Sequence, residues 1–156
     1  MPFTPFHFGS ALLFATLSGY LDFLTFMIAN VIVDFEPLLV LSLGLDLRYG
    51  YPLHGFFHTF IGGSLVALAL AEIMTKFYKH LGREISIKKL RITALCGVWL
   101  HILLDSFLYT DIKPFFPLSW NPFYGAFSAF EVYGFCIGAF LLGVPLYLLR
   151  KIKTSS

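Results

Sequence analysis

Charge is scarce in this chain, and so is cysteine. Only 13% of the 156 residues are charged, whereas a soluble globular domain carries about a quarter. The two cysteines, Cys96 and Cys136, both lie inside apolar runs, so they predict buried packing rather than a disulfide framework or a metal cluster. The first ten residues lack a basic region, and no removable signal peptide is expected. A net charge of +2 is too small to indicate nucleic-acid binding.

Hydrophobic residues, by contrast, make up 58% of the chain and include 19 phenylalanines. This composition predicts an integral membrane protein with the bilayer as its main partner. We expect an all-α fold, a polytopic membrane bundle of about four to five helices that forms one embedded domain over residues 1–156. At ~1.5 Å per residue, three segments are long enough to cross a bilayer: residues 55–78, 90–109 and 127–149.

The apolar region 8–45 has two interpretations. In the first, helices at about 6–18 and 23–35 form a short hairpin around a turn that contains Gly19 and Asp22, and an apolar stretch follows Pro37. In the second, a single span runs from Ser10 to Val33. The single span would bury Asp22 near the middle of the bilayer, which is costly without a partner.

Basic residues predict how the chain is oriented in the membrane. They gather in the segment 76–91 and again at 150–153. By the positive-inside rule, the 79–91 loop and the C-terminus should be cytoplasmic in a protein of the cell membrane. The segments 46–56 and 106–126 should then face outward.

Three pairs of polar residues stand four positions apart in or beside these apolar segments: Asn30 and Asp34, His54 and His58, His101 and Asp105. On a helix, this spacing places both side chains on one face. The expected topology brings the pairs to the outer end, together with His7 if residues 6–35 form a hairpin. Imidazoles and carboxylates form a mixed N/O ligand set that suits zinc first, with manganese or iron as alternatives. The predicted metal ligands are therefore His7, Asp34, His54, His58, His101 and Asp105.

Plainer interpretations exist for some of these residues. A lone histidine such as His7 is usually a hydrogen-bonded packing residue. Asp34 and Glu36 precede Pro37 and could mark a helix end at the interface. Ionisable residues inside membrane helices are expensive, however, which favours a functional role for His58, His101 and Asp105.

Several short motifs together resemble the YdjM-like family of small membrane-bound, metal-dependent hydrolases, the LexA-regulated inner-membrane hydrolase group. They are "HFG" (7–9), "VDFEP" (33–37), "GFFHT" (55–59), "HILLD" (101–105) and the aromatic segment "KPFFPLSWNPF" (113–123). The resemblance implies a multi-helix membrane fold and a hydrolase activity. It also implies ligand or catalytic roles for His7, Asp34, Glu36, His58, His101 and Asp105.

The chain departs from the family pattern at one motif. The family often shows His-Arg-Gly-x-Thr-His. Alignment on Gly55 and His58 puts His54 in the arginine's place and Leu53 in that of the first histidine. His54 is then either a shifted ligand or a replacement for an anion-binding arginine.

The expected chemistry is metal-assisted hydrolysis, with Glu36 and Asp111 as candidate general bases. Residue 55 is glycine, not the glutamate of His-Glu-x-x-His, which argues against a zinc peptidase of that type. Location at a membrane surface suggests a phosphoester, a lipid or another small molecule as substrate. Two alternatives stay open: a non-enzymatic protein that binds a metal, or haem through His58 and His101, and a small transporter, although no inverted repeat is seen.

Overall fold

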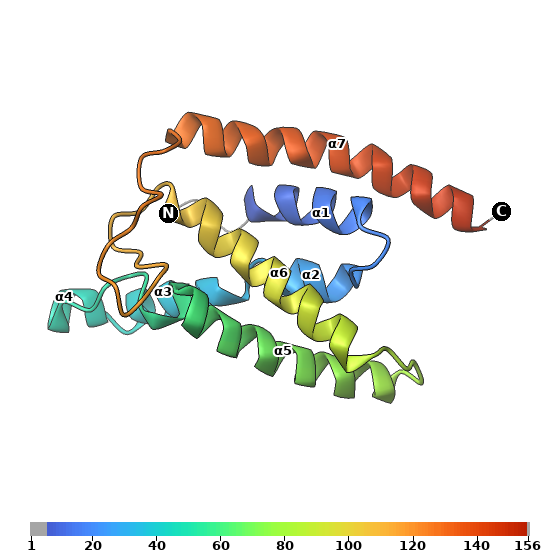
Figure 1. Cartoon of the computed structure of the whole chain (residues 1–156), viewed down its shortest axis with the longest axis horizontal. Helices are drawn as coiled ribbons and strands as arrows, with labels where there is room; N and C mark the ends of the chain where they lie inside the picture. Colours follow the sequence, from blue (N-terminus) through green and yellow to red (C-terminus); the bar gives the residue numbers. More distant parts are fainter. Residues whose placement is uncertain (1–5, 156) are drawn as a thin grey trace.

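The computed structural model describes residues 6–155, with side chains up to residue 153. The described chain is helical and contains no strand, which confirms the predicted all-α bundle. Figure 1 shows the helices running roughly along one long axis. The α-helices are α1 (His7–Leu17), α2 (Phe23–Ala29), α3 (Phe35–Ser42), α4 (Leu45–Tyr49), α5 (Phe60–His80), α6 (Ile87–Ser106) and α7 (Ala129–Ser155), and two 3-10 turns, Ile32–Asp34 and Phe56–His58, lie between them.

The N-terminal region is a hairpin, so the alternative of one span from Ser10 to Val33 is wrong. α1 and α2 are joined by a turn in which Asp22 caps α2 by accepting a hydrogen bond from the backbone of Thr25 at 2.9 Å. The Tyr78 hydroxyl donates to the same carboxylate at 2.8 Å. α1 has 11 residues, or about 17 Å of helix, which is too short to cross a hydrocarbon core of about 30 Å.

The second arm of the hairpin is longer than predicted. Helical structure does not end near residue 35 but continues through α3, so that Phe23–Ser42 is one apolar candidate span of 20 residues. Pro37 lies in the first turn of α3, where its missing N–H removes no helical hydrogen bond. The span is broken after Asn30, whose side-chain amide donates to the Gly97 carbonyl of α6 at 3.0 Å.

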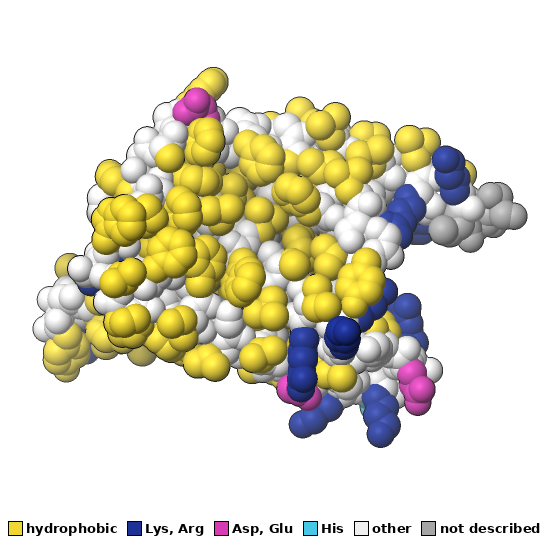
Figure 2. All heavy atoms as spheres, viewed as in Figure 1, with side chains coloured by type: hydrophobic (Ala, Val, Ile, Leu, Met, Phe, Trp, Pro, Cys, Tyr) yellow, Lys and Arg dark blue, Asp and Glu magenta, His cyan; other side chains and the backbone are white. Residues whose placement is uncertain are grey.

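Within the described residues, three segments are long and apolar enough to cross a membrane: Phe23–Ser42, Phe60–His80 and Ala129–Lys153. α6 is as long, with 20 residues, but begins with the basic residues Lys88, Lys89 and Arg91. α5 and α6 pack against each other through small and aliphatic residues that include Ala67, Ala71, Ala94, Val98 and Ile102. Many large apolar side chains remain exposed on the outside, and Figure 2 shows them spread over most of the visible face, as lipid contact requires.

The first and last helices lie side by side (Figure 1). Gly9 permits the contact, because a Cβ at this position would stand 2.1 Å from the Cys136 carbonyl oxygen of α7. Cys136 is buried at this contact, whereas Cys96 is exposed, so the expectation of buried packing holds for only one of the two cysteines.

Candidate metal centre

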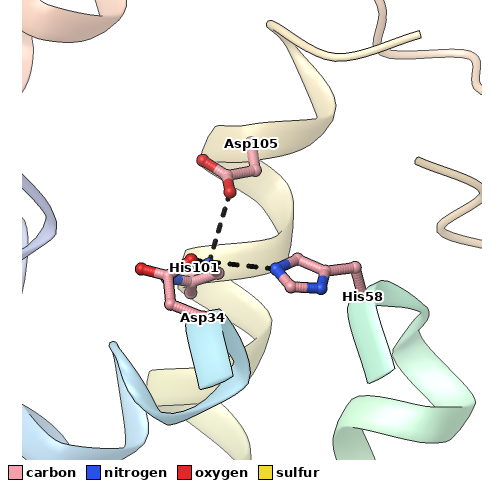
Figure 3. Close-up of side chains that lie close together, drawn as sticks. All are labelled: Asp34, His58, His101 and Asp105. Atoms are coloured by element: carbon pink, nitrogen blue, oxygen red, sulfur yellow. Dashed lines mark ion pairs between the residues drawn. The ribbon is translucent and has the colours of Figure 1, made fainter. Parts of the chain in front are cut away.

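Four predicted residues come together at one end of the bundle. Asp34 lies in the first 3-10 turn, His58 in the second, and His101 and Asp105 on α6 (Figure 3). One ligand atom from each lies within 4.8 Å of all the others. The group is formed by three chain segments that are far apart in the sequence.

The individual distances are short. Nε2 of His101 lies 3.3 Å from Oδ2 of Asp105 and 3.3 Å from Oδ1 of Asp34. Nε2 of His58 lies 3.9 Å from the same Asp34 oxygen. His58, His101 and Asp105 are fully buried, while the side chain of Asp34 retains 17% of its exposure.

Hydrogen bonds fix the two imidazole rings of the group. Nδ1 of His58 lies 2.9 Å from Oε2 of Glu36, and Nδ1 of His101 lies 2.7 Å from the Asn30 carbonyl oxygen. A proton on each Nδ1 would satisfy these contacts and leave each Nε2 as an electron-pair donor, which is the usual arrangement of metal-binding histidines.

Buried polar atoms without partners indicate that the group could hold a cation. Among the described residues, Nε2 of His58, Nε2 of His101 and Oδ1 of Asp105 are buried and form no hydrogen bond of normal geometry. Each unsatisfied buried group of this kind costs about 1–3 kcal/mol. A divalent cation among them would satisfy these atoms together, so the residues fit a metal.

His7 lies at the edge of this group. Its Nε2 is 3.0 Å from Oδ1 of Asp105, but the two atoms are not aligned as a hydrogen bond requires. Its ring stacks on that of His101, with ring centroids 4.1 Å apart. The structure thus brings His7 to the predicted end of the bundle, beside the four residues and not among them.

His54 lies outside the four and binds Asp111. Its Nδ1 lies 3.0 and 3.1 Å from the two Asp111 carboxylate oxygens, and its backbone N–H donates to Oδ2 at 3.1 Å. Burial alone would raise the pKa of Asp111, but the hydrogen bonds from His54 outweigh this effect and hold that pKa below its usual value. The ring of His54 contacts those of Tyr109 and His58, with centroids 4.4 and 4.8 Å away.

Two of the three predicted helical pairs do not have helical geometry. His101 and Asp105 share a face of α6, as expected. His54 and His58 do not, because α5 begins at Phe60 and not near residue 55. Asn30 and Asp34 are separated by the break after α2.

Glu36 explains why residues 55–58 stay out of the helix. Its carboxylate accepts hydrogen bonds from the backbone N–H groups of Gly55 and Phe57, at 3.1 and 3.2 Å, in addition to its contact with His58. A Cβ on Gly55 would stand 2.6 Å from Oε1 of Glu36. Both carboxylate oxygens are therefore engaged in holding the segment that carries His58.

Two contributors to this end of the molecule were not predicted as site residues. Asn30 orients His101 through its main-chain carbonyl, which no side-chain pattern reveals. The ring of Tyr109 packs on that of His54. The sequence feature that could have marked Tyr109 as a neighbour of the site is its position between Asp105 and Asp111.

A family model described as "YdjM inner membrane protein" matches residues 3–155. The chain belongs to this family. Searches of the curated proteins and of the solved structures found no match. Membership of the YdjM family agrees with the three apolar candidate spans and confirms the resemblance carried by the short motifs.

Proposed function

We propose that this YdjM-family protein is a membrane-bound, metal-dependent hydrolase. The observation that carries the proposal is the buried convergence of Asp34, His58, His101 and Asp105 within 4.8 Å. Ionisable groups inside a membrane protein are expensive, and they commonly mark functional sites.

The four residues would hold one divalent cation. Two imidazoles and two carboxylates suit zinc, with manganese or iron as alternatives. Such an ion, when bound, polarises a P–O or C=O bond of a substrate and lowers the pKa of water from about 16 toward 7. His7 would support the site by packing on His101 and placing its Nε2 beside Asp105.

Glu36 and Asp111 were the candidate general bases, and their surroundings differ. The Glu36 side chain is 8% exposed and accepts several hydrogen bonds, which supports an orienting role toward His58. The Asp111 side chain is 33% exposed and bonded to His54. Asp111 is thus the better placed of the two to receive a proton from water.

The position of the four-residue group in the membrane suggests the class of substrate. The group lies at the end of the bundle that the positive-inside rule assigns to the outer membrane surface. A phosphoester or a lipid at that surface is therefore the proposed substrate.

Burial favours a second candidate, a structural metal site. Closed sites with four protein ligands are typical of structural zinc, whereas catalytic sites keep an open position. Three of the four residues are fully buried, and only Asp34 retains exposure. A metal that stabilises the fold without hydrolysis would fit this burial.

The haem alternative is weakened by Asp34. One of its carboxylate oxygens lies 3.3 Å from Nε2 of His101 and 3.9 Å from Nε2 of His58. This carboxylate thus lies beside both of the nitrogens that would have to be axial haem ligands, where haem has no use for a carboxylate.

The test uses the full chain purified in detergent. We expect bound zinc or manganese, no Soret band, and loss of the metal in a His58→Ala, Asp105→Ala double variant. A matched control, His80→Ala with Glu84→Ala, changes exposed residues of the same kinds at the opposite end.

A panel of phosphodiesters and phospholipids then separates the two candidates. Metal-dependent turnover that is lost with the metal supports the hydrolase. Bound metal without turnover, together with a fall in melting temperature on chelation, supports the structural site. Absence of metal in the wild-type protein would contradict both candidates.

A further inference from the structure

A cavity lies at the end of the bundle opposite the candidate metal centre, between α7 and the turn that joins α1 to α2. Its volume is about 340 Å³, which is enough for a small head group. The residues that line it include Thr16, Leu21, Phe23, Tyr147, Arg150 and Lys151. None of them belongs to the candidate metal centre.

A guanidinium group is fixed at the wall of this cavity. Nη1 of Arg150 donates to the carbonyl oxygens of Thr16 and Ser18, at 2.7 and 3.3 Å. These bonds tie α7 to the end of α1 and set the position of the positive charge. Lys151 lines the same cavity, so that two cations stand at one opening.

Thr16 supplies a second observation that points to a ligand. Thr16 lines the cavity and is 7% exposed as a residue, and its hydroxyl is buried without a hydrogen-bond partner among the described residues. A buried hydroxyl normally finds a partner. A phosphate oxygen in the cavity would accept a hydrogen bond from it.

The other walls are apolar. Leu21 lines the cavity, and the rings of Phe23 and Tyr147 pack together with centroids 5.0 Å apart. Free inorganic phosphate gains nothing from such walls, whereas the glycerol and first methylene groups of a lipid would be buried against them.

The surroundings of the cavity are strongly basic. Nine of the eleven lysines and arginines of the chain lie in residues 76–91 and 150–153. Figure 2 shows Lys and Arg side chains on both sides of the hollow between the end of α7 and the α5–α6 connection. Basic pockets between membrane helices are suited to anionic head groups.

From this geometry we propose that the cavity binds the head group of an anionic phospholipid in the adjacent leaflet. Arg150 and Lys151 would neutralise the phosphate, and the Thr16 hydroxyl would donate to one of its oxygens. By contacting both helices, the bound head group would link the end of α1 to α7. The proposal is independent of the metal centre.

Native mass spectrometry of the full chain tests it, with phosphatidylglycerol and phosphatidylcholine of identical acyl chains as probes. We expect tighter binding of phosphatidylglycerol. Lys151→Gln should weaken it by about fivefold, and Thr16→Val, which keeps the side-chain shape, by about threefold. Arg150 is left unchanged because its bonds to α1 are part of the fold.

Lys79→Gln is the matched control, because it removes one exposed charge at the same end but outside the cavity. Equal binding of the two lipids would overturn the proposal, and so would an effect of Lys79→Gln as large as that of Lys151→Gln. An unchanged affinity in Thr16→Val would exclude the hydroxyl contact on which the site rests. Displacement of the lipid by millimolar inorganic phosphate would reassign the cavity to the free anion.

Discussion

At one end of the bundle, two histidines and two aspartates approach within 4.8 Å, almost entirely out of contact with solvent. At the other end, nine lysines and arginines spread over a largely exposed surface. The buried imidazoles and carboxylates would be hydrated in the unfolded chain, so the fold has to hold them in place. The exposed basic surface requires no precise geometry. Substitutions at the buried end should therefore change the geometry of the site. At most positions of the basic end, they should change only the local charge.

The largest expected difference between the two ends is that they lie on opposite sides of the membrane. In a background with Cys96→Ala and Cys136→Ala, we expect Ser119→Cys to react with a membrane-impermeant maleimide added to intact cells. Glu84→Cys should react only after the membrane is permeabilised, because the basic end is predicted to be cytoplasmic. The reverse labelling pattern would place the buried end, and its proposed substrate, inside the cell.

Glu36→Gln tests whether the geometry of the buried end, and not its charge alone, determines metal affinity. The amide keeps the shape of the side chain but weakens the contact that orients His58, so metal affinity should fall about 10–100-fold. Glu72→Gln, which removes an exposed partner of Arg91 at the basic end, should leave metal affinity unchanged. Both affinities can be measured by competition with a chromogenic chelator.

A different result for Glu36→Gln would revise its role. If metal binding were retained while hydrolysis was lost, Glu36 would be the general base and not an orienting group.

The smallest expected effect is a pH-dependent loss of stability at the pair of His54 and Asp111. The pKa of Asp111 is lowered in the folded state, so its ionised form stabilises the fold above the unfolded pKa of about 3.9. That contribution is lost as the pH falls through the folded pKa. Asp111→Asn should lower the melting temperature by about 1–3 °C at pH 7, because a third of the side chain is exposed.

The difference between Asp111→Asn and the wild type should shrink as the pH falls below about 4 and should vanish once the folded wild-type carboxylate is itself protonated. Glu84→Gln at the basic end is the control, with little change expected. A pH-independent loss in Asp111→Asn would mean that packing, and not charge, holds the pair together.

How far the sequence predicts this molecule depends on whether the determining contacts are local. His101 and Asp105 were placed correctly relative to each other because α6 is regular, and its spacing alone defines their shared face. The hairpin was also predictable, since Asp22 is too polar for the middle of a bilayer and acts as a helix cap instead. Both features follow from residues within one or two helical turns.

The geometry around His58 was not predictable in this way. Residues 55–58 look helical in isolation, but Glu36 binds their backbone from about twenty positions away. The pairing of His54 with Asp111 and the contact of Arg150 with Thr16 also join residues far apart in the chain. A periodic pattern carries no information about such contacts.

The close contact of Gly9 with α7 has a consequence for how the protein is made. α1 is synthesised first and α7 last, and the contact with Cys136 needs both. His7, two residues before Gly9, can therefore take its final place beside His101 only once translation has delivered the last helix. Until then His7 is missing from the edge of the candidate metal centre, so the nascent chain is expected to reach the membrane before that centre is complete.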